Sequence, residues 1–187
     1  MEKKFGQFTP VITSGSSASK GKALTGIPLQ IRNLVVELHS NIQKWNAAHL
    51  KGVPIVQSII DLKVDESYPE ELIQLCSSLE KVCETADEVV NNLQIIVDKL
   101  EKLESVHQNK GILFLTWPIE KYVSTVKNIY AAYKDEAKVK RVVFENIAHQ
   151  HEEAEKMVYF TSWIYQPQIP DNLTLRVEAM LIETGLR

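Results

Sequence analysis

The sequence predicts an all-α protein: an elongated bundle of three long helices with coiled-coil packing, followed by a C-terminal helical hairpin. The first observation is a heptad repeat within Ser67 to Val106, where apolar residues follow one another at alternating spacings of three and four. The second is helical apolar spacing on both sides of this repeat. The third is that only one short stretch resembles a strand, and it has no second strand to pair with. The repeat consists of Leu72, Leu75, Leu79, Val82, Ala86, Val89, Leu93, Ile96, Leu100 and Leu103.

The chain is predicted to have three parts. Residues 1–26 are rich in Ser, Gly, Lys and Thr without a hydrophobic period, so we expect a disordered N-terminal tail. The tail contains Thr9-Pro10, a pair that a proline-directed kinase could phosphorylate. Residues 27–150 are predicted to form the long-helix coiled-coil bundle, and residues 151–187 a C-terminal helical hairpin packed on it. A heptad helix of about 40 residues is roughly 60 Å long and needs other long helices beside it.

The first two helices of the bundle have recognisable start and stop signals. The first helix has an apolar face that includes Trp45, and its period is interrupted at Gly52-Val53-Pro54. We therefore expect a kinked or broken helix. The second helix is the heptad repeat, with Ser67 as its N-cap and its end near Asn109.

Residues 112–118 are apolar, and we interpret them as an ordered connector into the third long helix, capped by Thr116 or Trp117. Basic residues on that helix are interleaved with acidic ones. This pattern favours a solvent-exposed face with i,i+4 pairs over a nucleic-acid site. The basic residues are Lys134, Lys138, Lys140 and Arg141.

The predicted hairpin consists of two shorter helices. An aromatic-rich helix over residues 152–165 ends at Gln166-Pro167. The last helix has Asp171 as its expected N-cap and Gly185 as its expected C-terminal cap. Because the aromatic content exceeds what two short helices can bury between them, the hairpin is expected to dock on the bundle or on a partner.

Composition and motifs argue against several function classes. The formal net charge is −3 and the pI is near 6.0, so no basic footprint for direct nucleic-acid binding is expected. No apolar run approaches the roughly 18 residues of a membrane span, and a soluble intracellular protein is expected. Cys76 and Cys83 lie beside the heptad seam and are predicted to be reduced thiols. No catalytic, cofactor or metal motif is recognisable, which predicts a protein that is not an enzyme.

Several rare residues recur in order in the C-terminal part. The motifs are Leu113-Phe114-x-Thr116-Trp117-Pro118, Lys140-Arg141-x-Val143, Trp163-x-x-Gln166-Pro167 and Leu175-x-Val177-Glu178-x-Met180-Leu181-x-Glu183-Thr184-Gly185-x-Arg187. In these motifs the chain resembles the cyclin-dependent kinase 2-interacting protein family, most strongly over residues 113–187. The first helix, with Ile42-x-Lys44-Trp45, also looks like the family.

This resemblance implies a nuclear adaptor, with a cytoplasmic pool also conceivable, that has no catalysis of its own. Proteins of the family associate with cell-cycle kinases of DNA replication and with a replication-stress checkpoint kinase. They are also subunits of an assembly of two related AAA ATPases and a second small helical protein. That assembly acts in maturation of the large ribosomal subunit and in replisome protein turnover. The alternatives are a regulator that binds such kinases directly through residues 1–26, or an unrelated coiled-coil tether.

Ten residues are the candidates for partner contacts. Trp117, Trp163 and Met180 could equally seal the hairpin against the bundle, because aromatic residues at helical spacing are usually core. Acidic and basic residues of the last helix are harder to explain as core, although a solvated face would account for them. The candidates are Trp117, Pro118, Trp163, Gln166, Pro167, Glu178, Met180, Leu181, Glu183 and Arg187.

Overall fold

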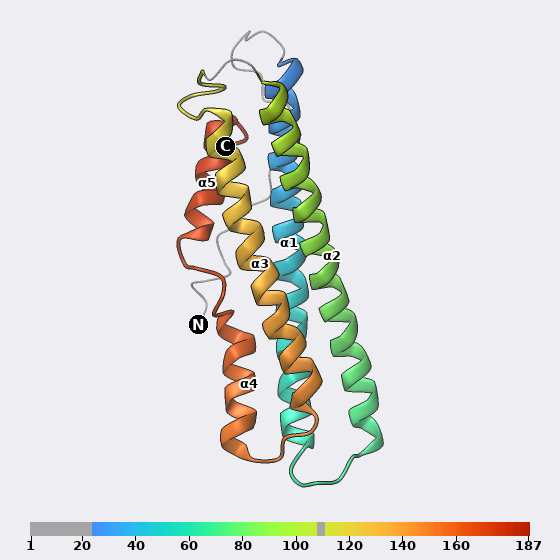
Figure 1. Ribbon diagram of the computed structural model, residues 1–187. Coiled ribbons are helices and arrows are strands. Elements are labelled where there is room, and N and C mark those ends of the chain that lie inside the picture. Colours follow the sequence, from blue (N-terminus) through green and yellow to red (C-terminus); the bar gives the residue numbers. More distant parts are fainter. Residues whose placement is uncertain (1–23, 108–110) are drawn as a thin grey trace. The chain divides into compact units, whose positions relative to one another are not determined.

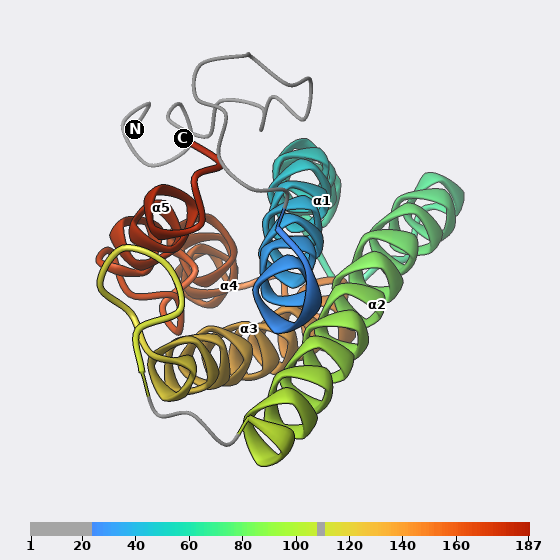
Figure 2. The same cartoon turned by 90° about the horizontal axis from the view of Figure 1, so that it is seen from above.

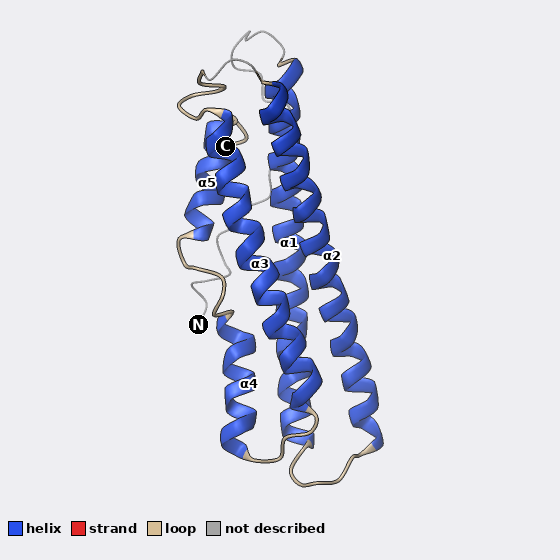
Figure 3. Cartoon of the chain, viewed as in Figure 1, coloured by secondary structure: helices blue, strands red, loops and turns tan. Residues whose placement is uncertain are grey.

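The computed structural model describes residues 24–107 and 111–187, and helices dominate both ranges (Figure 1). Figure 3 shows helices and loops there but no strand, and one isolated bridge joins Ile112 to Pro118. The all-α prediction is therefore confirmed. Most of the predicted tail, including Thr9, and the predicted helix end at Asn109 lie outside the described residues. The helices are α1 (Gly26–Leu62), α2 (Glu70–Val106), α3 (Ile119–Ile147), α4 (Glu153–Tyr165) and α5 (Leu173–Glu183).

The described residues group into two compact units. Unit 1 takes its residues from Met1–Gln43, Asn92–Tyr130 and Asp171–Arg187, and unit 2 from Lys44–Asn91 and Ala131–Pro170. Each long helix contributes residues to both units, whereas α5 belongs to unit 1 and α4 to unit 2. The two helices of the predicted hairpin thus belong to different units. The predicted boundaries at residues 26 and 150 stay a prediction.

In unit 1, surface ion pairs show which helices are neighbours. Lys99 of α2 lies 3.2 Å from Glu37 of α1, and Lys127 of α3 lies 2.6 Å from Glu101 of α2. The C-terminal part of α2 therefore borders both α1 and α3, as the view along the helices shows (Figure 2). These side chains are about half exposed, so they mark neighbours more than they stabilise them.

The heptad positions of α2 supply much of the core of both units. All ten are buried except Leu75 and Leu103, which are half-buried. This burial follows from the alternating spacing, which keeps one stripe of the helix facing its neighbours. Supercoiling of the helices stays a prediction. Within the described ranges, no helix is long and apolar enough to cross a bilayer.

Helix α1 runs without a break through Gly52 and Pro54, so the expectation of a broken helix was wrong. Pro54 lacks the N–H that would donate to the carbonyl of Leu50, so the helix continues with one hydrogen bond fewer at this point. Gly52 has a packing role, because the indole of Trp163 lies directly against its backbone. An added Cβ at Gly52 would lie 2.2 Å from Cζ2 of Trp163.

Two predicted N-caps were wrong. Helix α2 begins at Glu70, and Ser67 instead bonds to the carboxylate of Asp65 through its N–H (2.8 Å) and its hydroxyl. Such local side-chain bonding competes with capping. The N-cap of α5 is Asn172 rather than Asp171.

The predicted C-terminal cap at Gly185 is confirmed. Gly185 has a φ of +65°, its N–H bonds to the carbonyl of Ile182, and the N–H of Leu186 bonds to the carbonyl of Leu181. This is the Schellman pattern, in which the left-handed residue is usually glycine.

We expect Gly52→Ala to destabilise the protein by a net 1 to 2 kcal/mol, roughly, because the overlap with Trp163 outweighs the better helix propensity of alanine. Urea unfolding followed by circular dichroism measures this change. In a Trp163→Phe background, which makes room at this point, the added loss should largely disappear. An equal loss in both backgrounds would contradict the packing argument.

Candidate functional site

The ten predicted contact residues are divided between the two units. Trp163, Gln166 and Pro167 belong to unit 2, and the other seven belong to unit 1. Burial also divides them. The side chains of Trp163, Met180 and Leu181 are fully buried, whereas Pro167 and Arg187 are exposed. The buried members pack inside their own units, which agrees with the core interpretation of these side chains.

In unit 1, Glu183 at the end of α5 fastens the connector that precedes α3. Its Oε2 accepts hydrogen bonds from the N–H groups of Thr116 (2.9 Å) and Trp117 (3.2 Å), and its Oε1 accepts from the hydroxyl of Thr116. The predicted cap residues of α3 are thus bonded to Glu183 instead. Burial raises the pKa of Glu183, but the hydrogen bonds from Thr116 and its neighbours outweigh this, and the pKa is lowered.

Aromatic packing holds the same connector from the α3 side. The ring centroid of Tyr122 lies 5.2 Å from that of Trp117 and 5.9 Å from that of Phe114. Pro118 pairs with Ile112 in the isolated bridge. Trp117 and Pro118 are therefore half-buried residues of an ordered turn, and Glu183 is its anchor.

The other two charged candidates of unit 1 are paired with each other. The guanidinium of Arg187 donates to the carboxylate of Glu178. A solvated helix face was the alternative explanation for the charges of α5. The structure shows instead that Glu178 and Glu183 both have partners within the unit.

In unit 2, two tryptophans bond to the helices around them. Nε1 of Trp45 donates to Oε1 of Gln166 over 2.7 Å, and Nε1 of Trp163 donates to the carbonyl of His49 over 3.4 Å. Gln166 follows α4 with a φ of 46°, a left-handed conformation, and its side chain is buried. These bonds fix the turn after α4 against α1.

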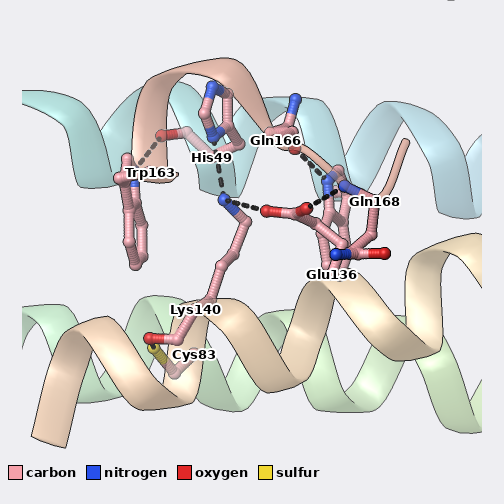
Figure 4. Close-up of polar contacts among 8 residues, drawn as sticks. His49, Cys83, Glu136, Lys140, Trp163, Gln166 and Gln168 are labelled. Carbon is pink, nitrogen blue, oxygen red and sulfur yellow. Dashed lines mark hydrogen bonds and ion pairs between the residues drawn. The ribbon is translucent and has the colours of Figure 1, made fainter. Parts of the chain in front are cut away.

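Figure 4 shows a buried charged cluster in unit 2 that sequence reasoning missed. Nζ of Lys140 lies 3.1 Å from Nδ1 of His49 and 3.7 Å from Oε1 of Glu136. The ammonium also lies 4.2 Å from the ring centroid of Trp163, within cation–π range. Oε2 of Glu136 accepts a 3.0 Å bond from the N–H of Gln168.

The solvent-exposed face predicted for Lys140 was wrong, because Lys140 and Glu136 are at most 1% exposed. A sequence signal for this burial exists. Glu136 and Lys140 continue an apolar stripe of α3 with spacings of four and three, so they occupy core positions. The stripe is Ile129, Tyr133, Glu136, Lys140, Val143 and Ile147.

Burial sets the electrostatics of this cluster. Desolvation lowers the pKa of Lys140 to about 8, although the charge of Glu136 opposes this, so the ammonium persists at neutral pH. Desolvation also raises the pKa of Glu136. Burial and then the charge of Lys140 lower the pKa of His49 to about 3. Because an ammonium only donates, Nδ1 of His49 must be the acceptor and the neutral imidazole carries its proton on Nε2.

The cluster is suited to holding structure together. It joins α1, α3 and the turn after α4 through residues that have their partners inside the unit. Burial raises the pKa of the nearby Cys83 to about 11, so its thiol stays protonated, and both cysteines are free. Among the described residues, no group of three His, Cys, Asp or Glu side chains could hold a metal ion.

The fold and these internal networks define the class: an all-α helical protein whose buried polar groups fasten helices and turns to one another. No protein-family profile matches the chain. Similar curated proteins, each called cyclin-dependent kinase 2-interacting protein, occur in Xenopus laevis (26% identity; 92% of this chain and 96% of that protein), Mus musculus (28%; 94% and 97%) and Homo sapiens (27%; 94% and 97%). This similarity supports the resemblance to the cyclin-dependent kinase 2-interacting protein family, and it extends well beyond residues 113–187.

We expect Glu183→Gln to lower the free energy of unfolding by about 1 to 3 kcal/mol, because charge-assisted hydrogen bonds are replaced by weaker ones. Hydrogen exchange should be faster at the amides of Thr116 and Trp117, because their N–H groups donate to the carboxylate of Glu183. Glu178→Gln serves as a control, since Glu178 pairs with Arg187 and does not contact the connector. Equal loss of protection in both variants would rule out a specific anchor.

The lowered pKa of His49 predicts acid sensitivity. Between pH 6.5 and 3 the unfolded chain binds a proton at His49 that the folded protein does not, so stability falls as the pH falls through this window. At pH 5 the loss from this residue is about 2 kcal/mol relative to pH 7. His49→Gln removes the titration, so its stability should fall less over the same range in urea unfolding. Parallel pH curves for the two proteins would disprove the assignment.

Proposed function

We propose that the chain is a non-catalytic adaptor that binds protein partners. The proposed partner is a cyclin-dependent kinase or an assembly associated with such a kinase. The observation that carries this proposal is the similarity to proteins named for interaction with cyclin-dependent kinase 2. That similarity covers 92 to 94% of this chain and 96 to 97% of those proteins.

The arrangement of polar and apolar groups is compatible with an adaptor. In both clusters described above, buried polar groups form hydrogen bonds within their own unit. Several large apolar side chains face outward instead, among them Ile73 (70% exposed), Leu115 (65%) and Val158 (63%). Exposed apolar side chains on helices are the usual anchors of helix-mediated contacts between proteins.

In its finer form, the proposal is a nuclear subunit of an assembly built on two related AAA ATPases, together with a second small helical protein. Its roles would be maturation of the large ribosomal subunit and turnover of replisome proteins, with links to DNA replication and checkpoint signalling. This form rests on the family resemblance alone. The competing proposal is a regulator that binds cell-cycle or checkpoint kinases directly through its N-terminal residues.

Removing residues 1–23 separates these proposals, because it deletes Thr9 and leaves α1 (Gly26–Leu62) intact. Proteins retained by the tagged chain from nuclear extract are identified by mass spectrometry, and purified cyclin-dependent kinase 2 with its cyclin is tested for direct binding. We expect both chains to retain the two ATPases and the small helical protein.

If the full chain recovers kinases without ATPases, and the deletion abolishes recovery of the kinases, the regulator is favoured. Recovery of no specific partner by either chain would refute the adaptor proposal. Trp163→Ala is a poor probe of contacts, because Trp163 is fully buried and its loss would destabilise unit 2 itself. Pro167→Ala changes an exposed candidate residue and is the better test of the turn after α4.

A further inference from the structure

Unit 2 has an apolar groove lined by residues from the start of α2 and the end of α3. Its volume is about 490 Å³, within the range of sites that hold ligands or side chains of a partner. The groove is lined mainly by apolar side chains. These include Tyr68, Leu72, Ile73, Cys76, Phe144 and Ala148.

The groove is preformed. Its floor contains Leu72, which is buried, while Ile73 (70% exposed) and Tyr68 (62%) present apolar surface to solvent. The hydroxyl of Tyr68 hydrogen-bonds to Nδ1 of His149 over 3.1 Å, which joins the two walls at one end. The ammonium of Lys63 lies 3.7 Å from the ring centroid of Tyr68 and holds the ring from the other side. A partner would therefore find Tyr68 already in position.

The rim of the groove carries acidic side chains. Glu80 and Glu145 stand at its rim, and both are exposed. Residues 64–80 contain five carboxylates and no Lys or Arg, and residues 142–155 contain four carboxylates and no Lys or Arg. Of the nearby cations, Arg141 is paired with Asp87 and Lys156 with Glu153. Lys63 is buried against the ring of Tyr68, and Lys81 follows Glu80 in the sequence. An acidic rim around an apolar floor attracts a partner of opposite charge and repels an acidic one.

We propose that this groove binds a cationic amphipathic segment of a partner protein. The segment lays apolar side chains on Tyr68, Ile73 and Phe144 and places Lys or Arg beside Glu80 and Glu145. This is the helix-in-groove mode of recognition. The inference rests on the proposed adaptor function and adds the chemistry of the partner to it.

Two synthetic peptides of about 18 residues, roughly five helical turns, test this chemistry. They share the same leucine positions and carry either lysine or glutamate elsewhere. Binding is measured by fluorescence anisotropy, and occupancy by the alkylation rate of Cys76, a half-buried thiol that lines the groove. The buried Cys83 is the internal reference. We expect the lysine peptide to bind and to slow alkylation of Cys76, and the glutamate peptide to do neither.

Matched variants locate the binding. Ile73→Ser should weaken binding of the lysine peptide about tenfold, whereas Leu175→Ser, which removes an equally exposed (70%) side chain from unit 1, should not. A second pair of variants tests the charges with equal changes in net charge. Glu80→Gln with Glu145→Gln should weaken binding about tenfold or more, and Asp98→Asn with Glu120→Gln in unit 1 should have little effect.

The proposal fails if each control weakens binding as much as its groove variant, since the peptide would then follow net charge alone. It also fails if the lysine peptide binds without slowing alkylation of Cys76. Slower alkylation at higher concentration of the chain itself would identify a second copy as the occupant. Faster alkylation after removal of residues 1–23 would identify the chain's own N-terminal segment instead, and either outcome overturns the proposal.

Retention of partners from nuclear extract is compared between wild type and Ile73→Ser. The comparison distinguishes failure of the groove proposal from failure of the adaptor proposal. If wild type and Ile73→Ser retain the same partners equally, the adaptor stands and the groove is not its contact. If neither retains a specific partner, the adaptor proposal itself is wrong.

Discussion

The burial of the Lys140 ammonium is the constraint on which unit 2 depends. A charge taken out of water is stable only when other groups replace its hydration. Here Glu136 supplies the opposite charge, His49 a lone pair and Trp163 the face of its indole. Because these groups come from α1, α3 and α4, the ammonium forces three helices into one register. The turn after α4 then follows, since Glu136 also binds the N–H of Gln168.

Unit 1 solves a similar problem with a carboxylate. The connector before α3 has N–H groups that no regular secondary structure bonds, and the part-buried donors among them need acceptors. Glu183 accepts from two of them and from the hydroxyl of Thr116. In each unit, therefore, a buried carboxylate fixes a turn against helices far away in the sequence. Polar residues of the C-terminal motifs, among them Gln166 and Glu183, therefore hold turns in place.

Helix periodicity made most of the fold predictable. The heptad stripe of α2, the third long helix and the glycine cap at Gly185 all follow from local rules, and the structure contains them. Local rules failed where tertiary contacts decided the outcome. Packing of Trp163 explains Gly52 inside a continuous α1, and Asp65 takes the hydroxyl that would have capped α2. The charge of Lys140 favoured an exposed face in the sequence prediction, although the position of Lys140 continues the apolar stripe of α3.

The candidate site was predictable only in part for the same reason. The family resemblance and residue type singled out Trp163, Gln166 and Glu183, but not that their partners are Gly52, Trp45 and Thr116. Those partners lie far away in the sequence, and no spacing rule connects them. The acidic groove was missed because its walls belong to two helices whose contact no local pattern reveals.

The long sequence separation of these bonds has a consequence for synthesis of the chain on the ribosome. Trp45 and Gln166 are 121 residues apart, and Thr116 and Glu183 are 67 apart. The N-terminal partners therefore leave the ribosome well before the residues that satisfy them. Neither unit can close until Gln166 and Glu183 have been made, so the nascent helices before them expose their apolar stripes until then. Apolar surface exposed in this way makes a nascent chain prone to aggregation.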